Sequence, residues 1–196
     1  PETAVEIASD SLTVFTLRQA RLEAERFSRD DVADFVGKLQ SLIEKLAAQV
    51  EKESYVRPQP LIDSLTKKTD IDNPEVFFEE MHEIGNTIKQ RLLTQGKYPR
   101  SHIHRVGEFL LRWLETADDF SYTHILSRYI AMTGAPSAKL EVRALDPAKV
   151  TEPIFASVYC SVNMSGTLQP LEAYVEVTKL PSSTICEAVP SPFPEE

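Results

Sequence analysis

The chain has 196 residues, 42% hydrophobic and 26% charged, which is the composition of one large or two small globular domains and excludes a disordered tail or collagen-like repeat. Its net charge of −9 excludes nucleic-acid binding spread over the whole surface, although a local basic strip is still possible. No apolar run approaches the roughly 18 residues of a membrane helix, so we expect no membrane partner. The two cysteines, Cys160 and Cys186, are too few for a disulfide framework or a four-thiolate metal site, which predicts a reducing compartment.

Apolar periodicity predicts two helices near the start of the chain. Residues 16–27 form a short candidate with Thr16 as its N-cap. Residues 29–52 carry apolar side chains at intervals of three and four, and Asp30 and Asp31 lie where the positive end of the helix dipole would be. We therefore expect the second helix to be amphipathic and to pack one face into a core.

Two further helices come later in the sequence. Pro58 and Pro60 are expected to end any continuation of the preceding helix. Residues 74–93 predict a third helix, with Asn73 as N-cap and proline at the first helical position, and residues 100–117 predict a fourth. Helices joined by such short links are expected to pack as antiparallel neighbours.

The pattern changes after about residue 120. Residues 122–131 and 139–145 are richer in strand-forming side chains, and the Gly134-Ala135-Pro136 turn between them predicts a β-hairpin. Next come a short helix at 146–155, capped by its aspartate, a buried strand at 157–164, and a second helix at 170–178. This strand, loop, helix order is typical of an α/β sheet, whose functional loops lie at the carboxyl ends of strands.

A hydroxyl, glycine, hydroxyl triplet, Ser165-Gly166-Thr167, occupies the loop after the predicted strand. Its two hydroxyl side chains could bond neighbouring loops while the glycine keeps the backbone accessible. Taken alone, the triplet favours a simple turn with a satisfied helix cap.

Two runs give this triplet a context: Leu140-Glu141-Val142-Arg143-Ala144-Leu145-Asp146-Pro147 and Met164-Ser165-Gly166-Thr167-Leu168-Gln169-Pro170. Together they resemble the XPD (Rad3) family of iron-sulfur superfamily 2 DNA helicases, in which the second run looks like motif III. Pro192-Phe193-Pro194-Glu195-Glu196 resembles that family's entry into its second motor domain, and Pro1-Glu2-Thr3-Ala4 resembles the segment after its Asp-Glu-Ala-His box. We therefore expect the chain to be a segment of a longer helicase.

The resemblance implies a domain organisation and a fold class. Residues 1–15 would end a segment of the first motor domain, 16–120 would form the helical arch domain, 121–185 would return into the first motor domain with motif III, and 186–196 would begin the second motor domain. The implied fold is α+β: an arch of mainly antiparallel helices, inserted in and leading into part of a RecA-like α/β motor domain.

The resemblance also implies a function. The parent protein would be an ATP-dependent 5′ to 3′ DNA helicase of nucleotide excision repair, using ATP, Mg²⁺ and a 4Fe-4S cluster, in a prokaryotic (archaeal) cytoplasm or a eukaryotic nucleus. No Gly-x-x-x-x-Gly-Lys-Ser/Thr occurs in the chain, so we expect this segment to be inert by itself, with no metal or cofactor of its own. Ser165, Gly166 and Thr167 would couple the nucleotide site to the DNA track.

One window of the chain is strongly basic. Between residues 85 and 112, the sequence has six Lys and Arg residues and a single acidic residue, Glu108. These cations could contact phosphates and a tyrosine among them could stack on a base, or the window could be an ordinary solvated helix face. The resemblance favours contact with single-stranded DNA, and the candidate residues are Lys89, Arg91, Lys97, Tyr98, Arg100, Arg105 and Arg112.

Other polar residues have simpler interpretations. His102 and His104 would point about 200° apart on a helix and could not share a metal, and His82 and His124 have no ligand pattern near them, so all four are expected at the surface or at caps. Trp113 lies on a predicted buried stripe and is expected in the core. A solvated acidic face is expected from Glu23, Glu25, Asp30, Asp31 and Asp34.

Three alternatives remain open at this point. The region could be mainly a non-catalytic docking module for a protein of a repair complex, because arch domains of eukaryotic relatives contact such partners. It could belong to a DinG-like helicase. It could also be a helical domain in which the triplet occurs by accident. In the leading hypothesis, its partners are single-stranded DNA and the motor and cluster domains of the same helicase.

Overall fold

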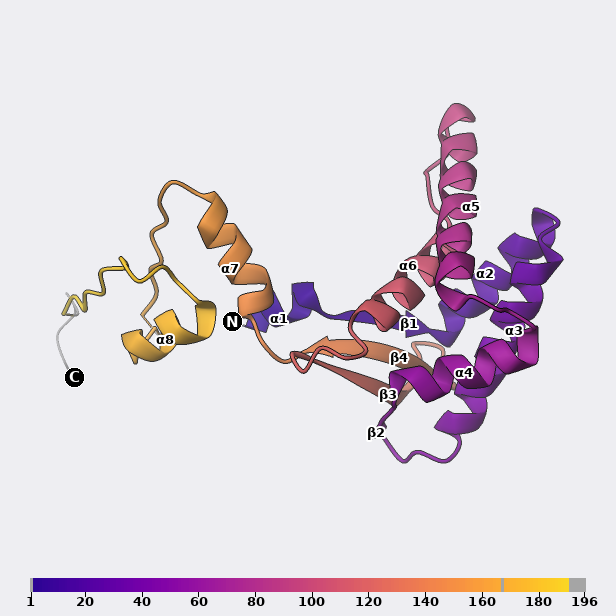
Figure 1. The fold of residues 1–196 in the computed structure, drawn as a ribbon, viewed down its shortest axis with the longest axis horizontal. Helices are drawn as coiled ribbons and strands as arrows, with labels where there is room; N and C mark the ends of the chain where they lie inside the picture. The colour runs from indigo at the N-terminus through magenta and orange to yellow at the C-terminus, as the bar shows by residue number, and fades with distance from the viewer. Residues whose placement is uncertain (1, 167, 191–196) are drawn as a thin grey trace. The chain divides into compact units, whose positions relative to one another are not determined.

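The computed structural model describes residues 2–166 and 168–190. It divides into two units, Ser9–Arg143 and a smaller one that combines the residues before 9 with those from 144 onward. Figure 1 shows the elements of each unit. Helices and an antiparallel sheet both occur in the described residues, which confirms an α+β fold.

A four-stranded antiparallel sheet lies in the larger unit, in the order β1-β4-β3-β2. Its strands are β1 (Asp10–Thr13), β2 (Glu53–Tyr55), β3 (Tyr122–Ile130) and β4 (Pro136–Ala144). The two long central strands are the predicted hairpin, which is confirmed. The two short outer strands were not expected from the sequence, and each pairs with a strand distant in the chain.

Helices α2 (Val14–Arg26) and α3 (Asp30–Ala47) come after the first strand. The predicted N-cap of the first of them is wrong: Thr13 caps α2, because its backbone is extended and its Oγ1 accepts a hydrogen bond from the backbone N of Thr16 at 3.1 Å. Helix α3 begins as predicted and ends five residues before residue 52, where the chain turns toward β2.

Helix α4 (Pro58–Thr69) was missed because two prolines were taken only as breakers. Both lie in the first turn of the helix, where a backbone N–H would have no intrahelical partner and its absence costs nothing. The side chains of Leu61 and Leu65 are buried in the core.

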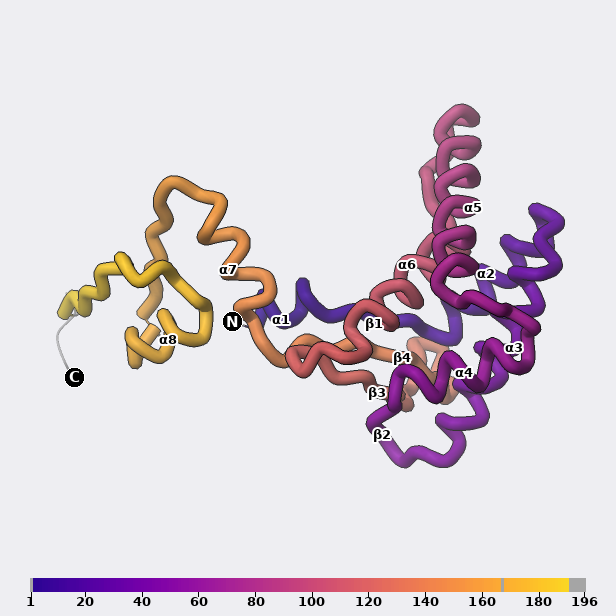
Figure 2. Tube along the Cα trace, viewed as in Figure 1, coloured from indigo at the N-terminus to yellow at the C-terminus, as the bar shows by residue number. Residues whose placement is uncertain are grey.

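Helices α5 (Pro74–Thr94) and α6 (His102–Glu115) confirm the third and fourth predicted helices. The side chain of Asn73 caps α5 by accepting a hydrogen bond from Val76 N at 3.2 Å, as its position predicted. After the helix, Gly96 has φ +67°, a left-handed conformation that glycine adopts without strain. The backbone trace in Figure 2 shows how this turn sends the chain back along α5.

The core of the larger unit lies between the helices and the sheet. Trp113 is fully buried there, as predicted, and its Nε1 donates to the carbonyl oxygen of Pro58 at 3.5 Å. The expectation that His124 lies at the surface is wrong: its ring is buried 4.6 Å from that of Trp113, and its Nε2 lies 3.0 Å from Oγ1 of Thr116. The hairpin helps to close this core, and the larger unit extends to residue 143.

The smaller unit contains α1 (Glu2–Ala8), α7 (Ala148–Ser157) and α8 (Leu171–Thr178), of which the last two were predicted. Thr151 Oγ1 on α7 donates to the carbonyl oxygen of Thr178 on α8 at 2.7 Å.

The prediction of a buried strand at 157–164 is wrong. Its first residue, Ser157, ends α7, the rest is irregular, and the side chains are exposed. The physical reason is that a strand needs a neighbour for its backbone N–H and C=O groups, and no strand of the described residues in this unit offers one. Ser165 and Gly166 come next in the same exposed segment, and Thr167 lies outside the described residues.

Candidate nucleic-acid interface

The α5–α6 hairpin is built on a close approach of two helix backbones (Figure 1). A Cβ added to Gly85 would lie 2.3 Å from Cβ and 2.5 Å from the backbone N of His104. A Cβ added to Gly107 would lie 2.9 Å from the backbone N of His82 and from the backbone O of Phe78. Only glycine fits at both contacts, so these two residues fix how α6 packs against α5.

Two histidines stack between these helices. The rings of His82 on α5 and His104 on α6 have centroids 4.2 Å apart with 38° between their planes. The Nδ1 of His82 lies 3.5 Å from Oε1 of Glu83 and 3.5 Å from Nδ2 of Asn86. Spacing along a single helix does not reveal this contact, because the partners come from different helices.

Burial lowers the pKa of three histidines in this unit. Desolvation is the main cause for His102, His104 and His124, while the charge of Arg100 adds to it for His102 and the charges of Lys89 and His82 add to it for His104. In each case, the folded protein binds a proton less readily than the unfolded chain does.

The free energy of unfolding should therefore fall as the pH is lowered from 7.5 to 5.5. A folded-state pKa below the unfolded value of about 6.5 means that the unfolded state takes up more protons, so stability is fully present above pH ~6.5 and is lost below it. Urea unfolding at several pH values checks this. A free energy of unfolding that stays constant over this range would contradict the prediction, and the variant His124→Gln should show a shallower decline than the parent chain.

The start of α6 is fixed by a carboxylate from α2. Oε2 of Glu23 accepts hydrogen bonds from the backbone N of Ile103 at 2.7 Å and from Oγ of Ser101 at 3.0 Å, and the same Oγ accepts from the backbone N of His104 at 3.1 Å. A negative charge at a helix N-terminus is favourable because it meets the positive end of the dipole. The expectation that Glu23 belongs to a solvated acidic face is therefore wrong.

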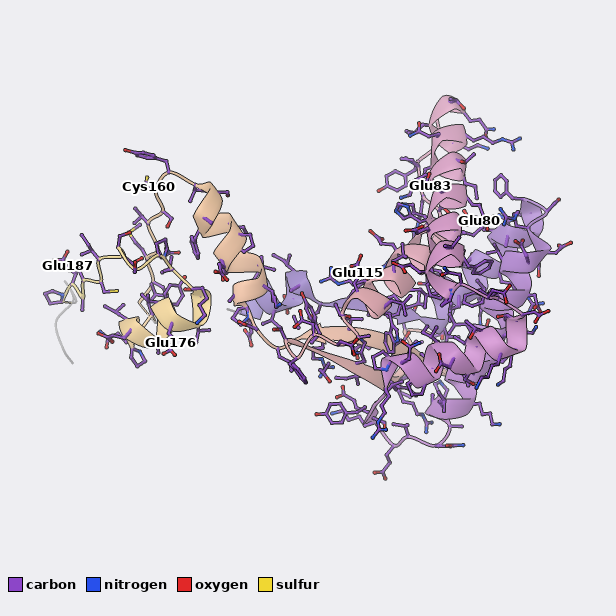
Figure 3. The ribbon with its side chains drawn as sticks, viewed as in Figure 1. Glu80, Glu83, Glu115, Cys160, Glu176 and Glu187 are labelled. Atoms are coloured by element: carbon purple, nitrogen blue, oxygen red, sulfur yellow. The ribbon has the colours of Figure 1, made fainter. Side chains whose placement is uncertain are left out.

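Five of the predicted DNA-contacting residues lie on the last turns of α5, which extend away from the sheet, and in the loop that leads back to α6 (Figure 1). Tyr98 is 82% exposed and lies in the loop between the helices. Figure 3 labels Glu80 and Glu83 lower on α5, and the sequence has no acidic residue between Glu83 and Glu108. We call this surface the basic tip, and it consists of Lys89, Arg91, Lys97, Tyr98 and Arg100.

The other two predicted contacts are half-buried and bond or pack against other elements of the protein. Nη1 of Arg105 donates a hydrogen bond to Oδ2 of Asp10 at 3.0 Å. Its Nη2 donates to Oδ1 of the same carboxylate and, at 2.8 Å, to the carbonyl oxygen of Ser11. Arg112 is half-buried, and its guanidinium lies 5.8 Å from the centre of the Tyr122 ring. These contacts join α6 to β1 and β3, which gives both arginines a structural role.

The basic tip has the chemistry of a single-strand contact. Arg91, Lys97 and Arg100 are exposed and Lys89 is half-buried, and the guanidinium of Arg91 also lies 5.8 Å from the centre of the Phe27 ring. Lys and Arg side chains at a surface can neutralise phosphates, and an exposed tyrosine ring can stack on a base. In the described part of the chain, no group of three or more His, Cys, Asp or Glu side chains is placed to hold a metal ion. None of the described helices combines the length and the apolar character that crossing a membrane requires.

Comparison with protein families identifies the domain family to which this architecture belongs. The family model of the helical and beta-bridge domain matches residues 18–186, and this domain is found in XPD/Rad3-type helicases. No curated protein sequence matches the chain. The match includes helices α3 to α8, strands β2 to β4 and most of α2. The chain therefore belongs to the helical and beta-bridge domain family, as a helical module associated with helicases.

Proposed function

We propose that the chain is the arch domain and adjoining motor segment of an XPD-type helicase that unwinds DNA 5′ to 3′ with ATP in repair. In this role, the basic tip holds the single strand beside the motor and cluster domains. The family match and the two resembling runs around residues 140–147 and 164–170 support the helicase assignment. The parent would use ATP, Mg²⁺ and a 4Fe-4S cluster supplied by its other domains.

The basic tip is the observation on which the DNA contact rests. It places four cations and an exposed aromatic ring on the last turns of α5 and the loop after it, in a chain whose net charge is −9. A solvated helix face would normally alternate cations with acidic residues, which form stabilising pairs along a helix. The concentration of one charge sign favours an anionic ligand.

The smaller unit supports the motor assignment in a different way. Between α7 and α8, apolar side chains that a soluble domain would normally cover are exposed: Val158, Tyr159, Val162 and Met164. In the parent helicase, the rest of the motor domain would cover these side chains. In that setting, Ser165, Gly166 and Thr167 would couple the nucleotide site to the DNA track.

Neutralising two tip cations, Lys97→Gln with Arg100→Gln, should weaken binding of single-stranded DNA and flatten its salt dependence. Each lost phosphate contact lowers the slope of log affinity against log salt by about 0.7, so two contacts give about 1.4. Tyr98→Ala should cost about 1–3 kcal/mol of binding with little change in slope, because stacking is not ionic. Fluorescence anisotropy with a labelled oligo-dT at several salt concentrations measures both.

The matched control removes two charges elsewhere, with Arg26→Gln and Lys52→Gln, whose side chains are exposed and outside the tip. Equal losses of affinity and slope in the two double variants would show a general field effect and reject the contact.

One observation favours the docking-module alternative. A groove of about 770 Å³ lies between the start of α2, the end of α3 and the turn of the β3–β4 hairpin, and the exposed side chains of Phe15 and Met132 border it. Under this alternative, both double variants should leave DNA affinity unchanged, so the same measurement separates the two functions.

A further inference from the structure

A second concentration of positive charge lies on another face of the larger unit. A hollow of about 350 Å³ is bordered by α2, α3 and the last residues of α4. Along α3, its lining residues recur at intervals of three and four, so they form one stripe of that helix. We call it the basic hollow, and its charged and small lining residues are Arg21, Asp34, Gly37, Lys38, Ser41, Lys45 and Lys68.

The charges around the basic hollow do not balance. Four cations line it against one carboxylate, Asp34, which pairs with Lys38 at 2.7 Å. Arg21 pairs with Glu25 at 3.1 Å. Among the residues that the structure describes, no carboxylate lies within ion-pair distance of Lys45 or Lys68, although they approach the hollow from different helices.

Gly37 lets the side chain of Arg21 lie close to α3 at the edge of the hollow. A Cβ at Gly37 would lie in ordinary van der Waals contact with Nη1 of Arg21, at 3.6 Å. The hydroxyl of Ser41 donates to the carbonyl oxygen of Gly37 at 2.9 Å, so it folds back on its own helix. Lys38 Nζ donates to the carbonyl oxygen of Lys68 at 2.7 Å and thereby ties α3 to the end of α4. The walls are thus linked around a hollow of about 350 Å³.

We propose that the basic hollow is a phosphate-binding site in which Lys45 and Lys68 make the main contacts and Arg21 closes one side. A solvated helix face would present cations from one helix, whereas here three helices direct cations to one hollow of a chain with net charge −9. Its volume is at the lower end of small-ligand sites, roughly 300–1,000 Å³. The phosphate can come from a nucleic-acid backbone or from a free phosphate ester. The site does not depend on DNA binding at the basic tip.

Amide chemical shifts of the isotope-labelled chain test this site. Titration with inorganic phosphate, against chloride at equal ionic strength, should shift the amides of Gly37 and Ser41 in a saturable way. Lys45→Gln with Lys68→Gln should weaken this binding about tenfold, because hydrogen bonds to charged groups are lost. Gly37→Gln, which fills the hollow without changing charge, should weaken it too, whereas the pair Arg26→Gln and Lys52→Gln should not.

A second arm with oligo-dT identifies the source of the phosphate. If the oligonucleotide shifts the same amides and Lys45→Gln with Lys68→Gln lowers its salt slope by about 1.4, the site takes a nucleic-acid backbone. If only inorganic phosphate shifts them, the site takes a free phosphate ester. Shifts that chloride reproduces, or equal losses in the hollow and control variants, would overturn the proposal. The tip variants Lys97→Gln and Arg100→Gln should leave the phosphate shifts unchanged, so failure of one site is distinguishable from failure of the other.

Discussion

Replacing Gly85 by alanine should destabilise the larger unit by about 3 kcal/mol, and Gly107→Ala should cost about 1–3 kcal/mol, because each added methyl group meets atoms that cannot move independently. At Gly85, the methyl carbon would lie 2.3 Å from Cβ and 2.5 Å from backbone atoms of His104. At Gly107, it would meet two backbone atoms of α5 at 2.9 Å. In each variant, α6 must move away from α5, which separates the two stacked histidines. Urea unfolding measures the loss of stability.

Gly37→Ala is the matched control, because Gly37 lies in a helix with ordinary van der Waals distance to its neighbours. Alanine is favoured over glycine in a helix interior by about 1 kcal/mol, so this variant should be more stable than the parent chain. The prediction fails if all three alanine variants change stability in the same direction.

The parts of the fold that the sequence predicted are those with local signals. Helix α3 was found from its apolar stripe, and α5 from Asn73 as N-cap and the proline after it, since both signals lie within the element. Strands β1 and β2 were missed because they are only three or four residues long and exist through pairing with distant strands. The segment 157–164 was predicted as a strand on composition, but composition does not supply a pairing partner.

The same difference between local and long-range signals decides which features of the candidate site could be predicted from the sequence. The basic tip could be predicted because its charges lie close together along the chain. The stack of His82 on His104, the cap that Glu23 provides for α6 and the pair between Arg105 and Asp10 could not, because each joins separate elements. Net charge in a window predicts where an anion could bind, but it does not show which cations already have a partner inside the fold.

Arg105→Gln should therefore act on stability and not on DNA contact. Its guanidinium bonds both oxygens of Asp10, whose side chain is 18% exposed, and the carbonyl of Ser11. Arg105 is itself 33% exposed and its Nη1 also lies 3.7 Å from Oε2 of Glu108, so removing one partner of this partly buried pair should cost about 1–2 kcal/mol. Asp10→Asn should destabilise by a similar amount, and the double variant should be less unstable than the sum of the two, with a coupling of about 0.5–1.5 kcal/mol. Urea unfolding of the four chains gives the coupling.

The salt dependence of DNA binding separates this role from the one that the sequence predicted. If Arg105 is neutralised by Asp10, then Arg105→Gln leaves the slope of log affinity against log salt unchanged, whereas Arg100→Gln lowers it by about 0.7. Asp10→Asn removes the closer of the two carboxylates that pair with Arg105, so it should keep or raise the slope despite its lower stability. A fall of about 0.7 for Arg105→Gln, with no coupling to Asp10, would instead mean that this arginine contacts a phosphate. The DNA contact would then extend from the basic tip along α6 toward the sheet.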